Sequence, residues 1–136
     1  EIGVRLVGSE MCIRDRDVWG HDIIAPKFGK EWFVPELPVE KFDVIVSCEV
    51  IEHLPDPVAI LSRALKSLKP RGVFAFQTAH YDPSACGRDW WYLGPANGHI
   101  SLYSTEAFNQ LARRLNVVEK LVWNNYPGLQ AWRICG

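Results

Sequence analysis

The segment from residue 41 to residue 78 constrains the fold of this chain most, because it predicts a strand, a helix and a second strand in direct succession. Residues 42–47 (FDVIVS) are a short apolar run rich in β-branched residues, as in a strand covered on both faces. Asp56 and Pro57 predict a helix start, since the Asp side chain accepts a free backbone N–H and Pro has none to leave unpaired. Residues 73–77 form the next apolar run. This order predicts a parallel sheet in an α/β fold.

The helix of this unit is expected to have one apolar face and to extend past residue 66. Lys66 and Lys69 are expected in its last turns, where positive charge suits the helix dipole. Pro70 and Gly72 are expected to end it. The apolar face consists of residues at helical spacing, which are Ile60, Leu61, Ala64, Leu65 and Leu68.

Polar side chains follow the first of these strands at the point where it ends. Ser47, Cys48 and Glu49 come first, and Glu52 and His53 follow after two apolar residues. In open parallel sheets, ligands bind outside the carboxyl ends of the strands. We therefore expect a ligand site here, with Glu49 facing the ligand and Glu52 exposed to solvent.

The block FDVIVSCEVIEHLPDP followed by LKSLKPRGVFAFQT resembles the central block of class I S-adenosylmethionine-dependent methyltransferases. In that family a Phe-Asp strand, a Glu-His-Leu turn, a helix and a Leu-Lys-Pro-Gly-Gly turn follow one another. The resemblance implies a Rossmann-like sheet, mostly parallel with an antiparallel carboxyl-terminal hairpin. It also implies S-adenosyl-L-methionine as cofactor and a small molecule as methyl acceptor. Arg71 departs from the pattern, because the family usually has the first of two glycines there.

The same resemblance assigns cofactor-binding roles at the ends of two strands. Asp22 ends a predicted strand over residues 18–24 and would hold the ribose hydroxyls of the cofactor. The alternative is an ordinary turn Asp. Ser47, Cys48 and Glu49 would lie along the cofactor, with Glu49 near its methionine end or the acceptor.

Two histidines are the candidate catalytic residues. His53 and His99 carry imidazole rings, which can take or give a proton near neutral pH. The alternative for His53 is a structural role in the turn after Leu54. No metal is expected, since Cys48, Cys86 and Cys135 lack the spacing of metal ligands and are interpreted as free thiols of a cytoplasmic protein.

A long irregular segment, residues 79–103, separates the second predicted strand from the rest of the chain. Loops of this length are functional or disordered, and the aromatic residues argue against disorder. Its Trp-Trp-Tyr, Gly-Pro and Gly-x-His-Ile-Ser motifs resemble a methyltransferase subgroup related to quinone-type O-methyltransferases, where this loop covers the acceptor pocket. The resemblance implies that Trp90, Trp91 and Tyr92 bind the acceptor. The alternative is that these rings pack the loop onto the body.

The beginning of the chain is interpreted as a library artefact. Residues 6–16 (LVGSEMCIRDR) match the translation of a common transposon-type sequencing adapter, so we exclude residues 1–16 from fold reasoning. Gly8 stands alone, without the glycine spacing or the crossover helix that a cofactor loop needs. We therefore expect residues 17–136 to be a partial domain that lacks its first strand.

The carboxyl-terminal part predicts one more helix and a hairpin. Ser104 is an expected N-cap, and the strands 117–123 and 129–134 flank a turn rich in Asn, Pro and Gly. The buried face of the helix is expected from residues at helical spacing, which are Phe108, Leu111, Ala112 and Leu115.

Charge and length exclude some partners and leave others open. The chain has 136 residues and a net charge of −1, without a basic run, so nucleic acid is not expected. No apolar run reaches membrane-spanning length. A nicotinamide-dependent reductase and a non-enzymatic or inactive α/β fragment stay as alternatives to a methyltransferase. The identity of the acceptor, the atom methylated and the oligomeric state are open.

Overall fold

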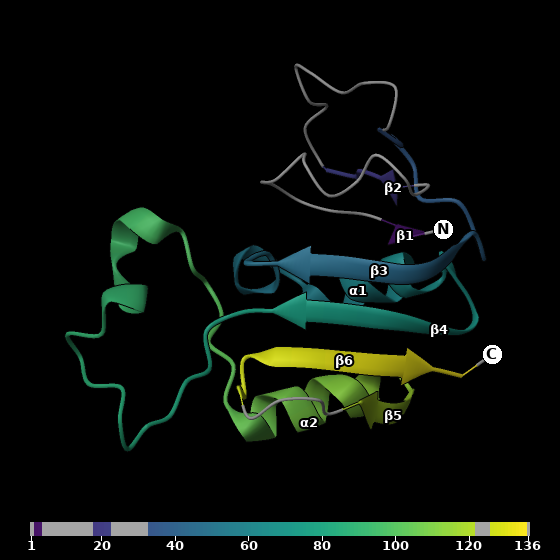
Figure 1. The fold of residues 1–136 in the computed structure, drawn as a ribbon. Coiled ribbons are helices and arrows are strands. Elements are labelled where there is room, and N and C mark those ends of the chain that lie inside the picture. The colour runs from purple at the N-terminus through teal and green to yellow at the C-terminus, as the bar shows by residue number, and fades with distance from the viewer. Residues whose placement is uncertain (1, 4–17, 23–32, 122–125, 136) are drawn as a thin grey trace.

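A computed structural model describes residues 2–3, 18–22, 33–121 and 126–135 of the chain. They form a mixed sheet with two α-helices and short 3-10 turns (Figure 1). The strands are β1 (Ile2–Gly3), β2 (Val18–Trp19), β3 (Phe42–Cys48), β4 (Leu68–Gln77), β5 (Val117–Leu121) and β6 (Leu129–Ile134). The helices are η3 (Ile51–His53), α1 (Pro57–Leu65), η4 (Trp91–Leu93), η5 (Pro95–Asn97) and α2 (Thr105–Arg114).

The sheet has six strands in the order β2-β1-β3-β4-β6-β5. Strands β2, β1, β3 and β4 run parallel, whereas β6 is antiparallel to both β4 and β5. The predicted α/β fold, mostly parallel with an antiparallel carboxyl-terminal hairpin, is therefore confirmed. Because β3 and β4 are parallel neighbours, the residues that follow them meet at one edge of the sheet.

Residues 2 and 3 bear on the expectation that the first strand is missing, which stays a prediction. Ile2 and Gly3 pair in parallel with both β2 and β3, so the position of the strand expected to be missing holds a two-residue strand. Parallel pairing requires only extended backbone beside the neighbouring strands, and it does not require the glycine loop and crossover helix on which the expectation was based. Residues 4–17, with Gly8 and most of the proposed artefact, lie outside the described residues.

Helix α1 begins as predicted and ends earlier than predicted. The Asp56 carboxylate accepts a hydrogen bond from the Ala59 N–H at 2.9 Å, as an N-cap does. The helix ends at Leu65, because the Ser67 carbonyl accepts hydrogen bonds from the backbone at the start of β3. Lys69 therefore lies in β4 and not in the helix, and its ammonium group is 3.0 Å from the Asp43 carboxylate.

The backbone of the first half of β4 explains why glycines suit positions 71 and 72. Arg71 has a φ of 63°, in the left-handed region that costs a residue with a Cβ about 1–2 kcal/mol. A Cβ on Gly72 would lie 2.9 Å from both the Leu68 Cβ and the Lys69 carbonyl oxygen. Arg71 thus adopts a strained conformation that glycine would accept freely.

The core lies between the sheet and the two α-helices. Trp132 is fully buried, and its ring meets that of Phe76 edge-on at 4.6 Å between centroids. Phe108 of α2 approaches the same Phe76 ring at 5.8 Å, which fixes the helix against the sheet. As predicted, Ser104 caps α2, and its hydroxyl accepts a hydrogen bond from the Ala107 N–H at 3.2 Å. The buried face of α2 is the one predicted, which is Phe108, Leu111 and Ala112, with Leu115 buried beyond the helix end.

The segment between β4 and α2 projects beyond the end of the sheet, on the side to which the arrowheads of β3 and β4 point (Figure 1). Its two ends are joined by a bridge between His80 and Tyr103. Most of its length is irregular, as predicted, with the short turns η4 and η5 inside it. We call residues 79–103 the projecting loop.

Candidate functional site

The polar residues that follow β3 and β4 meet where the projecting loop leaves the sheet. Glu49 follows β3, and its N–H donates to the Gln77 carbonyl of β4 at 2.8 Å. Its φ of 50° turns the backbone sharply out of the strand. Ser47 is buried within β3, whereas Cys48 is exposed at its end. These three residues therefore lie at the carboxyl end of β3, as predicted.

Glu52 corrects an expectation, because its side chain is fully buried and not exposed to solvent. The tight turn η3 directs the carboxylate inward, and its Oε2 accepts a hydrogen bond from the Thr78 hydroxyl at 2.9 Å. The Glu52 carbonyl accepts from the N–H groups of Ile100 and Ser101, at 2.9 and 3.1 Å. Its Oε1 has no hydrogen-bond partner among the described residues. No local sequence pattern predicted the burial of Glu52.

Tyr92 connects the projecting loop to Glu49 directly and to Glu52 through Thr78. Its side chain is buried, with 1% of its surface exposed. The hydroxyl lies 3.0 Å from the Thr78 hydroxyl and 3.2 Å from the Glu49 Oε2. The Ala79 N–H donates to the same hydroxyl at 3.4 Å. Thr78 directly follows β4, and no sequence pattern predicted that its hydroxyl would contact Tyr92 and Glu52.

The two predicted catalytic histidines lie together beside Tyr92. The ring centroids of His53 and His99 are 4.8 Å apart. The His53 Nδ1 lies 3.0 Å from the Gly98 carbonyl oxygen, and the His99 Nδ1 lies 2.8 Å from the Tyr92 carbonyl oxygen. Because a carbonyl oxygen only accepts hydrogen bonds, both Nδ1 atoms carry a hydrogen in this arrangement. In the neutral ring, the Nε2 atom is then the one that accepts a proton.

Burial changes the acidity of two groups in this cluster. Partial burial raises the pKa of the Glu49 carboxyl, and the nearby Glu52 carboxylate raises it further. Burial likewise raises the pKa of the Tyr92 phenol well above its usual range. Glu49 therefore holds its proton more readily than an exposed glutamate, and Tyr92 stays a neutral hydrogen-bond donor.

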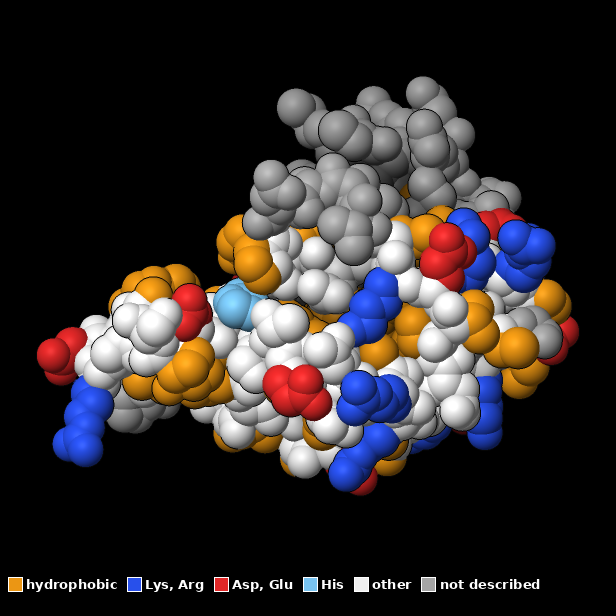
Figure 2. Space-filling model, turned by 90° about the horizontal axis from the view of Figure 1, so that it is seen from below, with side chains coloured by type: hydrophobic (Ala, Val, Ile, Leu, Met, Phe, Trp, Pro, Cys, Tyr) orange, Lys and Arg blue, Asp and Glu red, His pale blue; other side chains and the backbone are white. Residues whose placement is uncertain are grey.

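Trp90 and Trp91 are presented differently by the loop. Trp90 is half-buried, and its ring stacks on that of Tyr92 at 5.0 Å. Trp91 is 70% exposed, and Leu93 and Ile100 are exposed as well. Figure 2 shows hydrophobic side chains on the surface of the projecting loop. Of the three aromatic residues predicted to bind an acceptor, only Trp91 is mainly exposed.

Asp22 is exposed at the same edge of the sheet. It follows β2, which runs parallel to β3 through β1, so the carboxyl ends of these strands face the same way. The bridge between Gly20 and Phe33, and the bond from the Val34 N–H to the Gly20 carbonyl at 2.8 Å, extend the edge beyond β2. Residues 23 and 24 of the predicted strand lie outside the described part.

Glu52, His53 and His99 offer ligand atoms within 4.8 Å of one another, which raises the question of a metal. Ligand atoms that are about 2.1 Å from one ion lie at most about 4.2 Å apart. The three groups are therefore too widely spread to bind one ion as they stand. The absence of a metal stays a prediction.

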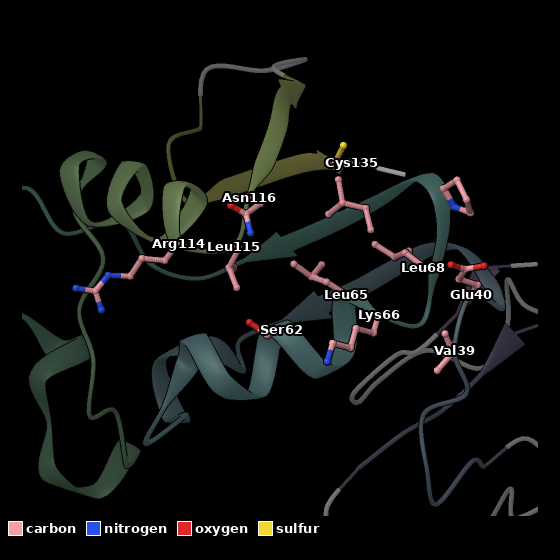
Figure 3. A pocket seen from close by; sticks show the side chains of 12 residues that line it. Val39, Glu40, Ser62, Leu65, Lys66, Leu68, Arg114, Leu115, Asn116 and Cys135 are labelled. Carbon is pink, nitrogen blue, oxygen red and sulfur yellow. The ribbon is translucent and has the colours of Figure 1, made fainter.

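A separate groove of about 460 Å³ lies at the other end of the sheet (Figure 3). Leu65 of α1, Leu68 at the start of β4 and Leu115 after α2 provide its apolar lining. Lys66 and Arg114 stand at its rim. The polar cluster follows the opposite end of β4, so the groove is not part of the candidate site.

Comparison with known proteins gives a consistent result for sequence and for fold. The family described as "Methyltransferase domain" matches residues 2–118. The ubiquinone biosynthesis O-methyltransferase of Histophilus somni is 31% identical over 100 residues, which are 74% of this chain and 40% of that protein. The enzyme of the same name from Pseudomonas putida is 38% identical over 66 residues, 48% of this chain and 28% of that protein. The chain thus spans less than half the length of these relatives.

Two solved structures share the fold at low sequence identity. The phosphoethanolamine N-methyltransferase 2 of Haemonchus contortus, in complex with S-adenosyl-L-methionine, has a TM-score of 0.64 at 17% identity. The match covers 82% of this chain and 30% of that one. The 1,6-didemethyltoxoflavin-N1-methyltransferase of Burkholderia thailandensis has a TM-score of 0.60 at 18% identity, over 88% of this chain and 62% of that one. Both likenesses support the Rossmann-like sheet predicted from the sequence.

Proposed function

The chain belongs to the methyltransferase domain family, and from this membership we propose that the protein transfers a methyl group from S-adenosyl-L-methionine to a hydroxyl group of a small-molecule acceptor. The observation that carries the proposal is the meeting of Glu49, His53 and His99 at the carboxyl ends of β3 and β4. This edge is where parallel sheets of this kind bind ligands. The O-methyltransferase names of the relatives from Histophilus somni and Pseudomonas putida favour oxygen as the atom methylated.

The cofactor is assigned to the edge formed by β2, β1 and β3. Asp22 is exposed at the end of β2 and would accept hydrogen bonds from the ribose hydroxyls. Ser47, Cys48 and Glu49 would lie along the cofactor toward its methionine end. S-adenosyl-L-methionine supplies an electrophilic methyl group on a sulfonium. The protein's own contribution is to hold the acceptor in line with that methyl group.

The acceptor is assigned to the space beside the projecting loop. Trp91 is exposed there and offers a flat apolar surface on which an aromatic ring can stack. Trp90 is half-buried and would line the same space, where its ring stacks on that of Tyr92. An acceptor hydroxyl becomes a better nucleophile when its proton is removed. His99, with Nε2 as its proton-accepting atom, is assigned that step, and His53 stands beside it.

The two alternatives are disfavoured by specific observations. A nicotinamide-dependent reductase is disfavoured because residues 2–118 match the methyltransferase domain family. A merely structural domain would not need a partly buried carboxyl, a buried carboxylate and two imidazoles at a strand exit.

Within the described residues no helix is long and apolar enough to cross a membrane. A cytoplasmic location is part of the proposal.

Titration calorimetry with S-adenosyl-L-methionine tests the cofactor assignment. The 136-residue chain is expected to bind at micromolar to millimolar concentration, and Asp22→Ala is expected to weaken binding at least tenfold. Asp43→Ala is the matched control, because Asp43 is an exposed carboxylate at the opposite end of β3, whose ion pair with Lys69 contributes little. Absence of saturation up to millimolar cofactor would overturn the proposal for this chain.

A further inference from the structure

Four side chains form one continuous hydrogen-bonded path that leads from the exposed residue Glu49 into the interior, and we call it the hydroxyl bridge. It runs from the Glu49 Oε2 to the Tyr92 hydroxyl at 3.2 Å. It continues from Tyr92 to the Thr78 hydroxyl at 3.0 Å. It ends at the Glu52 Oε2, 2.9 Å from Thr78. Tyr92, Thr78 and Glu52 are each at most 1% exposed, so water does not replace these bonds.

The number of protons in the hydroxyl bridge follows from its chemistry. Three oxygen–oxygen contacts need three hydrogens, one in each. The hydroxyls of Tyr92 and Thr78 supply two, and an ionised carboxylate supplies none. The third hydrogen must therefore sit on one of the two carboxyls. Glu49 and Glu52 thus share one proton, with every donor in the bridge pointing away from the carboxyl that holds it.

The shared proton is favoured at the Glu49 end of the hydroxyl bridge. The groups that face Glu49 are the carboxylate of Glu52, the phenol of Tyr92 and the imidazole of His99. The imidazole of His53 faces Glu52, with its Nε2 3.9 Å from the Glu52 Oε1. Partial burial and the Glu52 charge raise the pKa of Glu49, while the field of His99 and a bond that Tyr92 donates to the ionised form of Glu49 lower it. The balance favours the protonated carboxyl relative to an exposed glutamate.

Tyr92 also holds His99 by two contacts. The two rings stack with centroids 3.8 Å apart and planes 29° apart. The Tyr92 carbonyl oxygen receives the hydrogen of the His99 Nδ1 at 2.8 Å. The carbonyl and the phenol both belong to Tyr92. The hydroxyl bridge that fixes the phenol therefore also fixes the carbonyl oxygen that accepts from the His99 Nδ1.

From this geometry we propose that Tyr92 is a positioning residue, which holds His99 with its Nε2 free to accept a proton as long as Glu49 and Glu52 share one proton. The use of His99 in methyl transfer rests on the proposed function, whereas the hold on His99 does not. When the shared proton is lost, one contact of the bridge has two oxygens and no hydrogen between them. That contact opens, and Tyr92 and the loop around it loosen.

Nuclear magnetic resonance of the 136-residue chain tests the hold on His99 without any methylation assay. The readout is the ¹⁵N signal of the His99 ring at alkaline pH, where imidazole rings are generally neutral. In the wild type the shared proton is lost there, and a mixture of tautomers is expected. Glu49→Gln is expected to keep the Nδ1–H tautomer, because its amide N–H donates to Tyr92 and does not titrate. The ring of His80, which contacts Thr105 at 3.0 Å, is the internal control.

Two further results complete the test. In Tyr92→Phe the bridge has no hydroxyl at its centre, and a tautomer mixture is expected at every alkaline pH. The Ile100 amide, which donates to the Glu52 carbonyl, is expected to exchange faster than in the wild type at moderate pH, while the Leu115 amide of the α2 end does not change. If Glu49→Gln shows the same tautomer mixture as the wild type, the shared proton does not control His99. If Tyr92→Phe keeps a single tautomer, Tyr92 is not a positioning residue.

The same data separate this proposal from the proposed function. Failure of cofactor binding in calorimetry leaves the tautomer measurement unaffected, and the reverse also holds. If Tyr92→Phe does not fold, as shown by circular dichroism, the comparison of Glu49→Gln with the wild type decides alone.

Discussion

The ring of Tyr92 stacks on the imidazole of His99 at 3.8 Å between centroids, although a turn and a second short helix separate the two residues in the chain. The Tyr92 carbonyl holds the same imidazole through Nδ1. Tyr92 therefore belongs to the interior of the site and connects the projecting loop to the ends of β3 and β4. The predictions below concern this connection first and the surrounding fold afterwards.

Removal of the Thr78 hydroxyl is expected to destabilise the fold. Thr78→Val deletes the donor to Glu52 and one partner of Tyr92, and it leaves the buried Glu52 Oε2 without a hydrogen bond among the described residues. We expect the free energy of unfolding in urea to fall by about 1–3 kcal/mol. Thr105→Val removes a hydroxyl whose partner within the described part of the chain is the exposed Nε2 of His80, and it is expected to change the free energy of unfolding by less than about 0.5 kcal/mol. Equal effects of the two substitutions would contradict a special role of Thr78.

The raised pKa of Glu49 makes stability depend on pH. Because the folded state holds this proton more tightly than the unfolded chain, the contribution of Glu49 to stability is fully present below the ordinary glutamate pKa of about 4.3. It then falls as pH rises through the raised pKa of Glu49. Glu49→Gln is expected to remove this part of the decline, and Glu36→Gln, at an exposed carboxylate, is expected to keep it. Urea unfolding at a series of pH values measures both, and a decline that persists in Glu49→Gln would contradict the assignment.

Glycine at position 71 is expected to relieve backbone strain in the first half of β4. Arg71 has a φ of 63°, and glycine adopts this conformation without steric cost. Arg71→Gly is expected to raise the free energy of unfolding by about 1 kcal/mol relative to Arg71→Ala, which keeps the Cβ and the strain. Thermal unfolding of the two variants gives the comparison. A less stable glycine variant would mean that the Arg71 side chain contributes more than the strain costs.

The aromatic core between α2 and the sheet is expected to be the most sensitive region. Phe76 is 1% exposed and contacts the rings of Trp132 and Phe108. Phe76→Ala leaves a cavity and is expected to cost about 3–5 kcal/mol. Val118→Ala, at a side chain that is 58% exposed in β5, is expected to cost less than about 0.5 kcal/mol. Chemical unfolding followed by circular dichroism distinguishes these outcomes, and similar losses would contradict the core assignment.

Local sequence patterns predicted the elements that depend on nearby residues. The N-caps Asp56 and Ser104 act three residues along the chain, so composition and spacing were enough to place both helix starts. The end of α1 depends instead on pairing between Ser67 and the start of β3, which is distant in sequence. For that reason Lys69 was placed in the helix and is found in β4.

The sequence alone determined the fold class and the order of strands and helices around β3 and β4, because hydrophobic periodicity and capping are local properties. The catalytic roles of His53 and His99, which were inferred from imidazole chemistry and the family resemblance, stay a prediction. Only the tertiary structure decided that Glu52 is buried and that Thr78 and Tyr92 connect it to Glu49. The physical reason is that a carboxylate becomes buried when residues far along the chain supply its hydrogen bonds. No local pattern shows which hydroxyls those will be.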